Sequence, residues 1–339
     1  MQAPSKLHIG ITYDLRSDYL ALGYGEEETA EFDSEVTVDA LAEALGALGY
    51  APDRIGSVRR LCERLVGGER WDCVFNFCEG LKGVAREAQV PALLEAYDIP
   101  YVFSDPLTLA LALDKAMAKR VARDCGVPTT PFDVIKRIED ASRIELIFPL
   151  FLKPIAEGSG KGVGARSKVD NRTELERTAA DLLQRFDQPV LVETYLPGRE
   201  FTVGITGTGS AAEILGIMEV MITKNAEPHG YGYDNKENFA GRMNYRLADD
   251  AEAQEAGRVA LAAWRALNCR DGGRIDIRSD ASGRPHFIEV NPLAGLHPVR
   301  SDLIYIARFK GITYLDLVGR IMTAFHARHS ELVRPQPAA

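Results

Sequence analysis

The segment 274–291 constrains the fold of this chain most, because apolar and polar residues alternate on either side of Ser282-Gly283. Such alternation is typical of two antiparallel strands joined by a tight turn. A two-residue turn at Ser282-Gly283 places Asp276 opposite Glu289 on one face, with Asn291 two residues further along that face. On the other face, this register pairs apolar residues that can be buried: Ile275 with Val290 and Ile277 with Ile288.

The polar face of this predicted hairpin is a candidate metal site. Asp276 and Glu289 would place two like charges directly opposite each other, which destabilises a sheet unless a cation lies between them. Two carboxylates and the amide oxygen of Asn291 suit Mg²⁺, which completes its coordination with substrate phosphates and water. In the alternative interpretation, the hairpin is exposed and its acids are simply solvated.

A second polar segment begins with a predicted strand that ends near Lys153 and continues into a loop, residues 157–164, that contains four glycines. Because glycine has no side chain, the N–H groups of such a loop can approach an anion closely. The loop is not a P-loop, because Lys161 is followed by Gly162 rather than by Ser or Thr. By itself the segment fits a phosphate-binding loop and a flexible surface turn equally well.

Further candidates lie on both sides of this loop. The apolar run 190–196 includes Glu193 and Tyr195, which can offer a backbone edge and an aromatic wall to an adenine. Glu200 follows closely enough to accept hydrogen bonds from ribose hydroxyls. Asp114-Lys115 lies on a predicted helix, where a solvated ion pair is the alternative interpretation. Each of these features alone is more often structural.

The first third of the chain alternates predicted strands with predicted helices, which indicates a parallel sheet covered on both faces. The segment 126–131 contains two prolines and ends this pattern, so we place a domain joint there. Beyond the joint, predicted strands come in pairs, which indicates an α+β region. The predicted strands are 7–12, 73–77, 99–103, 148–155, 189–196, 200–206 and the hairpin, and the predicted helices are 34–48, 87–97, 106–125, 172–186, 251–268 and 313–327.

With 339 residues, of which 46% are hydrophobic, the chain is long enough to form more than one core. A polar loop is expected over 225–242. The predicted division is 1–126 for an N-terminal α/β domain, 127–206 for a small α+β subdomain, 207–330 for a C-terminal subdomain with the metal site, and 331–339 for a disordered tail.

Composition excludes several classes of protein. The 49 acidic against 40 basic residues give a net charge of -9, which argues against a nucleic-acid surface and for a small-molecule substrate. No stretch reaches the roughly 18 apolar residues of a membrane span, and the opening residues lack the features of a signal peptide, so we expect a cytoplasmic protein. The cysteines lack metal-ligand spacing and are expected to be buried, reduced thiols: Cys62, Cys73, Cys78, Cys125 and Cys269.

Six short segments follow one another along the chain: Asp114-Lys115, Phe151-Leu-Lys153 with its glycine loop, Glu193-Thr-Tyr-Leu196, Glu200-Phe-Thr-Val203, Arg274-Ile-Asp276 and Ile288-Glu-Val-Asn291. In this order they resemble the ATP-grasp superfamily and, more closely, the D-alanine–D-alanine ligase family. The resemblance covers nearly the whole chain. It implies an ATP-grasp fold of two α+β subdomains behind an N-terminal doubly wound, Rossmann-like parallel-sheet domain, and a homodimer, because related ligases often dimerise.

The resemblance also implies a role for each matching residue. ATP would lie between the two subdomains, with its phosphates on Lys115 and Lys153, its adenine between Glu193, Tyr195 and Leu196, and its ribose on Glu200. Two Mg²⁺ ions, or Mn²⁺ as a substitute, would be held by Asp276, Glu289 and Asn291. Lys236, in the polar loop, would reach the terminal phosphate when that loop closes.

The implied reaction joins a carboxylate to an amine. The carboxylate of a first amino acid would attack the terminal phosphate in line, and the amine of a second would then attack the resulting acyl phosphate. Arg274 and the backbone N–H of Gly295 match the family's stabilisers of the oxyanion that develops in this second step. Closure of the polar loop would exclude the water that otherwise hydrolyses an acyl phosphate.

Four differences from the family pattern fall around the substrate pocket. Two concern the first amino acid: an acidic insertion, residues 19–32, precedes Asp33, the candidate for the acid that holds the amino group. The loop after Lys153 is also longer, which places Ser159 at the position of the family's serine.

The other two differences change hydrogen-bonding groups. Glu237 stands where the family has a loop tyrosine. The segment after Asn291 also differs from the family pattern. It ends at Arg300 and Ser301, the candidates for binding the second carboxylate. A site with other hydrogen-bonding groups accepts other substrates. The alternative is therefore the same chemistry on a different amino-acid or small carboxylate pair, in a pathway other than cell-wall synthesis.

Two further classes of function remain open. A phosphotransferase would stop at the phosphorylated carboxylate and release ADP without an amine. A nucleotide-binding regulator without chemistry would lack the metal ligands, yet Asp276, Glu289 and Asn291 are present. A dinucleotide-dependent oxidoreductase is excluded, since no glycine-rich turn follows the first predicted strand.

Overall fold

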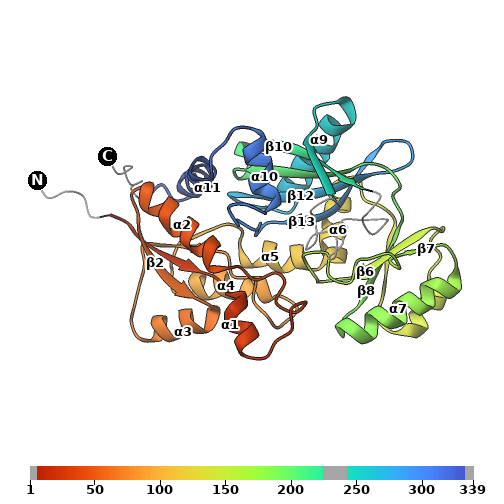
Figure 1. Ribbon diagram of the computed structural model, residues 1–339, viewed down its shortest axis with the longest axis horizontal. Coiled ribbons are helices and arrows are strands. Elements are labelled where there is room, and N and C mark those ends of the chain that lie inside the picture. The colour runs from red at the N-terminus through yellow and green to blue at the C-terminus, as the bar shows by residue number, and fades with distance from the viewer. Residues whose placement is uncertain (1–5, 224–242, 333–339) are drawn as a thin grey trace, which may run out of the picture.

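The computed structural model describes residues 6–223 and 243–332, and its strands form three sheets packed with helices (Figure 1). The strands are β1 (His8–Thr12), β2 (Ala51–Gly56), β3 (Cys73–Asn76), β4 (Tyr101–Val102), β5 (Phe132–Ile135), β6 (Leu150–Pro154), β7 (Lys168–Val169), β8 (Val190–Thr194), β9 (Glu200–Thr206), β10 (Glu213–Ile222), β11 (Met243–Leu247), β12 (Gly272–Ser279) and β13 (Pro285–Asn291). The helices are α1 (Arg16–Ala21), α2 (Glu35–Ala47), α3 (Val58–Val66), α4 (Gln89–Ala96), α5 (Pro106–Leu113), α6 (Lys115–Asp124), α7 (Arg172–Phe186), α9 (Ala251–Ala266), α10 (Asp302–Phe309) and α11 (Tyr314–Arg328).

The first sheet has the strand order β2-β1-β3-β4 and is parallel throughout. Successive residues of β3 point to opposite faces, so Phe75 is buried with residues of α2 and α11, whereas Val74 is buried with residues of α3 and α4. The predicted parallel sheet covered on both faces is confirmed. The sequence did not predict β2, because Ala51-Pro-Asp53 has the composition of a turn.

The single helix predicted over 106–125 is wrong, because Asp114 divides this segment into two helices, α5 and α6. Asp114 is extended, with φ -81° and ψ 98°, and its side chain accepts a hydrogen bond of 2.9 Å from the N–H of Met117. Asp is among the preferred N-cap residues because its carboxylate satisfies an N–H at the start of a helix. Lys115 therefore becomes the first residue of α6, and Asp114 is its helix cap rather than a solvated partner.

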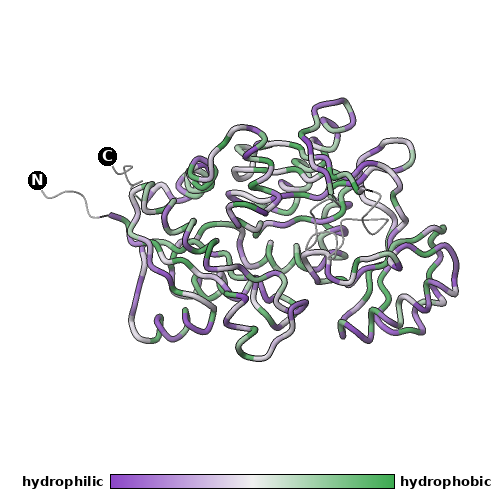
Figure 2. The backbone as a smooth tube through the Cα atoms, in the orientation of Figure 1, coloured by the Kyte–Doolittle hydropathy of each residue, from purple (hydrophilic) through white to green (hydrophobic). Residues whose placement is uncertain are grey.

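The other two sheets are formed by strands that follow residue 131. The smaller has the order β5-β8-β6-β7 and is covered by α7, whose hydrophobic and hydrophilic residues alternate along its turns (Figure 2). The larger has the order β11-β10-β9-β12-β13, with α9 packed on one face and α10 on the other. Gly204 on β9 allows α10 to approach, because a Cβ atom there would lie 3.0 Å from Leu303.

The hairpin β12-β13 has the predicted register at its polar end and a different register near its turn. Asp276 lies opposite Glu289 as predicted, but Ile277 lies opposite Phe287, so Ile288 is an extra residue in a β-bulge. The predicted pair of Ile277 with Ile288 is therefore wrong. Ile288 is half-buried, whereas Ile277 and Phe287 are fully buried in the core.

The predicted two-residue turn is also wrong. The connection has three residues, 281–283, closed by a 2.9 Å hydrogen bond from the N–H of Asp280 to the carbonyl of Arg284. Gly283 has φ +81°, the left-handed conformation that follows a type I turn in three-residue hairpin loops. The carboxylate of Asp280 accepts from both the N–H and the hydroxyl of Ser282, which favours this longer turn.

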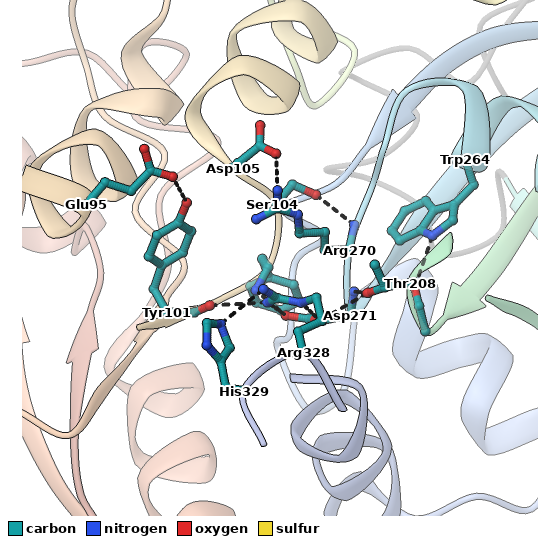
Figure 3. A network of polar contacts seen from close by, with 12 residues as sticks. Glu95, Tyr101, Ser104, Asp105, Thr208, Trp264, Arg270, Asp271, Arg328 and His329 are labelled. Atoms are coloured by element: carbon teal, nitrogen blue, oxygen red, sulfur yellow. Dashed lines mark hydrogen bonds and ion pairs between the residues drawn. The ribbon is translucent and has the colours of Figure 1, made fainter. Parts of the chain in front are cut away.

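A buried polar network joins the first sheet to the largest sheet (Figure 3). Asp271, fully buried before β12, accepts hydrogen bonds from Nε and Nη2 of Arg328 at 2.9 and 2.6 Å. It also accepts from the N–H of Phe103, which follows β4, at 2.8 Å. Thr208 donates to its other oxygen at 3.3 Å. One carboxylate thus connects β4, the end of α11 and β12, the strand that carries the candidate metal ligand Asp276.

Within the described residues, no helix combines the length and the apolar character that a membrane crossing requires. All five cysteines are free; Cys62 and Cys125 are exposed, so the expectation of buried thiols is wrong for these two because each sits on the solvent side of its helix or helix end. The proposed boundaries between domains stay a prediction. Of the expected tail, 331–339, residues 333–339 lie outside the described residues.

Candidate active site

Two cavities meet at the junction of the three sheets. The first, of about 830 Å³, is lined by the described residues predicted to contact ATP and by two predicted metal ligands, Asp276 and Glu289; the ATP residues are Lys115, Lys153, Glu193, Tyr195, Leu196 and Glu200. The second, of about 1490 Å³, is lined by the third predicted metal ligand, Asn291, and by the described residues predicted to act on the substrates: Asp33, Ser159, Arg274, Gly295, Arg300 and Ser301. Lys115, Glu157 and Glu289 line both cavities. A group bound in one cavity can therefore meet a group bound in the other at these residues.

A buried ion-pair cluster forms the floor of the first cavity. Glu193 on β8 contacts Lys119 at 2.6 Å and Lys153 at 3.2 Å. Burial would raise the pKa of Glu193, but the two lysines outweigh this and lower its pKa to about 2. Burial would likewise lower the pKa of Lys153, but Glu193 and Glu289 raise it. Lys153 is thus held as a cation in the cavity.

Lys119 is a member of this cluster that the sequence analysis missed. It is fully buried on α6 and also donates to the carbonyl of Phe287 at 2.9 Å. Its pKa is lowered, mainly by burial. The available signal was spacing: Lys115 and Lys119 are four residues apart, which places both on one face of the helix. With Lys119 and Lys153 present, the Glu193 side chain is bound from two sides.

Tyr195 lines the first cavity. Phe151 stacks against its ring at 6.3 Å between ring centroids, and the cation of Arg278 lies 5.4 Å from the ring centroid. Arg278 also contacts Glu200 at 3.4 Å. Glu200 therefore lies at the mouth of the same cavity, beside the aromatic wall.

The candidate metal ligands come together on the polar face of the hairpin. Asp276 accepts a 2.9 Å hydrogen bond from the hydroxyl of Thr202, and the amide nitrogen of Asn291 lies 3.4 Å from it. Glu289, opposite Asp276, lies 3.6 Å from the Lys115 amine and 3.7 Å from Lys153. Two carboxylates, an amide oxygen and a cavity that can admit phosphates fit Mg²⁺.

Cationic groups line the second cavity. Arg274 contacts Asp276 and, at 3.5 Å, Asp302. Burial would lower the pKa of Arg274, but these acids outweigh it and raise that pKa, so the side chain is charged. Gly295 lies beside Ser301, whose hydroxyl would be 3.1 Å from a Cβ atom at that position. Ser301 accepts a 2.9 Å hydrogen bond from the N–H of His297, and Arg300 is exposed at the rim. The predicted oxyanion and carboxylate groups thus lie in one cavity.

Acidic groups also line this cavity. Burial raises the pKa of Asp33 to about 7. Glu79 and Glu87, which the sequence analysis missed, follow the carboxyl end of β3, where ligands commonly bind to parallel sheets. Burial raises the pKa of Glu87 to about 7, and burial together with Glu87 raises that of Glu79. Within residues 6–223 and 243–332, neither glutamate makes a hydrogen bond or ion pair.

Three other candidate residues from the sequence analysis are Ser159, Lys236 and Glu237. Ser159 has φ +51°, a left-handed conformation that is uncommon outside glycine, and it lines the second cavity. Lys236 and Glu237 lie outside the described residues.

Solved structures share this fold. D-alanine–D-alanine ligase from Bacillus anthracis in complex with ATP has a TM-score of 0.71 at 21% identity, covering 96% of this chain and 99% of that one. The VanG D-Ala:D-Ser ligase from Enterococcus faecalis has a TM-score of 0.72 at 18% identity, covering 95% and 100%. The fold is therefore ATP-grasp, as predicted.

Sequence relatives identify the family to which this chain belongs. The family described as D-ala D-ala ligase C-terminus matches residues 121–323. D-alanine–D-alanine ligases from Bordetella petrii and Parvibaculum lavamentivorans are 34% identical, covering 78% of this chain and 78% of the first relative, and 84% of this chain and 90% of the second. An uncharacterized protein of Sinorhizobium fredii is 31% identical, covering 76% of this chain and 75% of its own. The chain belongs to the D-alanine–D-alanine ligase family.

Proposed function

We propose that this enzyme is an ATP-dependent, ADP-forming carboxylate–amine ligase that activates an amino acid as an acyl phosphate and joins it to the amine of a second. The observation that carries the proposal is the shared wall of the two cavities. Lys115 and Glu289 line both, so a nucleotide phosphate in the first cavity and a carboxylate in the second would meet between them.

In the first cavity, Lys115 and Lys153 would bind the phosphates of ATP, Tyr195 and Leu196 would enclose the adenine with the backbone of Glu193, and Glu200 would accept from the ribose. Because Glu193 holds Lys153 at 3.2 Å, the amine is positioned before the nucleotide binds. Lys236 would add a cation on the terminal phosphate. The substrate carboxylate oxygen would attack the terminal phosphorus, and the bond to the departing ADP oxygen would break.

The metal ions belong to the same proposal. Asp276, Glu289 and Asn291 would hold two Mg²⁺ ions, which neutralise charge on the transferring phosphoryl group. Lys115 and Lys153 already lie within 3.7 Å of Glu289, so these amines would add to the positive charge around the transferring group.

In the second step, the amine nitrogen of the second amino acid would attack the acyl carbon. Arg274 and the N–H of Gly295 would stabilise the oxyanion that forms, phosphate would leave with one oxygen of the original carboxylate, and the amine would lose a proton to solvent. Ser159 would contact the first substrate. A phosphotransferase would lack this second step, and the presence of Arg274 and Arg300 in the substrate cavity favours the ligase.

The polar groups of the second cavity fit two amino acids. Asp33, Glu79 and Glu87 would attract the first amino group, whereas Arg300 and Ser301 would bind the second carboxylate. Glu237 would face the same substrates when the loop closes. Because several relatives are named for D-alanine, we favour this amino acid over the alternative of a different pair. We further propose a homodimer that acts in the cytoplasm.

Transfer of oxygen-18 tests the acyl phosphate. We expect that a first amino acid labelled in its carboxylate will transfer one labelled oxygen to inorganic phosphate for each amide formed, as measured by mass spectrometry of the phosphate. Amide formation with unlabelled phosphate would contradict the mechanism. Label that accumulates in an acyl phosphate without amide would identify the phosphotransferase instead.

A further inference from the structure

The acidic insertion between the first strand and α2 has an ordered path in the structure. Its two ends lie side by side, because the N–H of Arg16 donates to the carbonyl of Asp33 at 2.9 Å and that of Asp33 donates to the carbonyl of Asp14 at 3.1 Å. Arg16, which precedes the insertion, contacts Glu26 within it at 2.5 Å. The insertion is therefore a closed loop whose residues can contact the rest of the molecule.

One of these residues reaches the glycine-rich loop that follows β6. Glu31 contacts Arg86 at 3.0 Å and Lys161 at 3.3 Å, and Lys161 also contacts Glu157 at 2.5 Å. These four side chains are 7 to 15% exposed. Burial would raise the pKa of Glu31, but Arg86 and Lys161 outweigh it and lower that pKa. The cluster contains two acids and two bases, so its charges are balanced.

The backbone of the glycine-rich loop lies directly against Glu31. A Cβ atom at Gly158 would be 2.0 Å from Oε1 of Glu31, so any larger residue there would displace the Glu31 carboxylate. Arg86 also donates to the carbonyl of Ala156 at 2.9 Å. The N-terminal domain thus holds the loop at its first residues and, through Glu31, at Lys161.

This loop separates the two cavities. Gly160 and Lys161 line the nucleotide cavity, whereas Gly158 and Ser159 line the substrate cavity. Any movement of residues 157–161 therefore changes both cavities together. The exposed pair of Glu27 with Arg185, at 3.4 Å, is a further contact between the insertion and α7, but both side chains are 45% exposed. Such a pair contributes little to positioning.

We infer that Glu31 and Arg86 are positioning residues, which tie the insertion and the N-terminal domain to the glycine-rich loop and fix that loop as the wall between nucleotide and substrate. The catalytic consequence rests on the proposed ligase function. The structural consequence, a loop held in place by a buried ion cluster, does not depend on that function.

The variant Glu31→Gln keeps the shape of the side chain and removes its charge. We expect the amide hydrogens of residues 158–163 to exchange roughly tenfold faster or more, the effect of losing a charge-assisted hydrogen bond. The KM for ATP should rise while the exchange of the larger sheet stays unchanged. The matched control is Glu27→Gln in the same insertion, for which loop exchange should stay within about twofold of the original chain.

A second variant, Lys161→Gln, removes the cation that Glu31 contacts on the glycine-rich loop and leaves Glu31 paired with Arg86. It tests the inference even if Glu31→Gln does not fold. Faster loop exchange in both variants, but not in the control, would support the inference. Unchanged loop exchange in Lys161→Gln would overturn it. Since hydrogen exchange needs no turnover, this result is independent of whether the original chain forms an amide.

Discussion

Replacing Glu289 with glutamine is expected to lower kcat for ADP release by about 100-fold or more, equivalent to roughly 3 kcal/mol of transition-state stabilisation. Glu289 lies opposite Asp276 and within 3.7 Å of two lysine amines, at the wall that both cavities share. The amide keeps the size of the side chain but loses the charge that would hold Mg²⁺. Steady-state kinetics at saturating Mg-ATP measure the change.

The control for this prediction is Glu213→Gln on β10 of the same sheet. Glu213 is exposed and contacts only Arg320, at 3.4 Å, among the described residues, so this variant should retain the original kcat. Thermal unfolding checks that Glu289→Gln is folded. If the folded Glu289→Gln enzyme retains kcat within about fivefold, the assignment of Glu289 to the phosphoryl-transfer site is wrong.

The second large effect is expected on stability. Asp271→Asn should lower the free energy of unfolding by about 3 to 5 kcal/mol, the cost of breaking a buried ion pair and leaving its partner charged. Asp271 is fully buried and binds Arg328 through two hydrogen bonds (Figure 3). It accepts a third from the N–H of Phe103. Asn also tolerates the φ of +64° at this position, so the effect arises from charge rather than from backbone strain.

Denaturant unfolding of the original chain and of two variants measures this effect. The control, Glu331→Gln, alters an acid that is 62% exposed and contacts only His329 among the residues described, so its unfolding should not change. At a temperature where Asp271→Asn is folded, its ligase activity should be largely retained, because Asp271 lines neither cavity. A loss of stability below about 1 kcal/mol would show that the network in Figure 3 does not hold the sheets together.

Patterns with a strict period gave the most reliable predictions. Alternation along 274–291 predicted the hairpin and the opposition of Asp276 and Glu289, because a half-buried strand must place its apolar residues on one face. Near the turn the same reasoning gave the wrong register. Asp280 stabilises a three-residue loop by side-chain hydrogen bonds, and the extra residue Ile288 is then accommodated in a bulge. Periodicity contains no information about either feature.

The helix break at Asp114 has a similar cause. Residues 106–125 have helical composition on both sides of the break, and a local side-chain contact to Met117 decides where one helix ends and the next begins. The break matters for function, because it places Lys115 at the start of α6 and against both cavities.

Contacts between distant segments could not be predicted from one sequence. Lys119 and Glu193 are 74 positions apart and meet only after the smaller sheet packs on α6. Glu31 and Lys161 are separated by 130 positions, and the insertion that carries Glu31 has no periodic pattern. The residues that would contact ATP were assigned from their resemblance to the family, and the structure brings the described ones into one cavity.

The most direct test of the ligase is the release of ADP by the purified protein with Mg-ATP and D-alanine alone, with mass spectrometry of the product. The predicted result is one ADP for each D-alanyl-D-alanine formed. If D-alanine gives no turnover, the same assay with D- and L-amino acids in pairs separates substrate from chemistry: ADP with a new amide would retain the ligase and replace the substrates. ADP release without any new amide, or no ADP with any pair, would contradict the ligase.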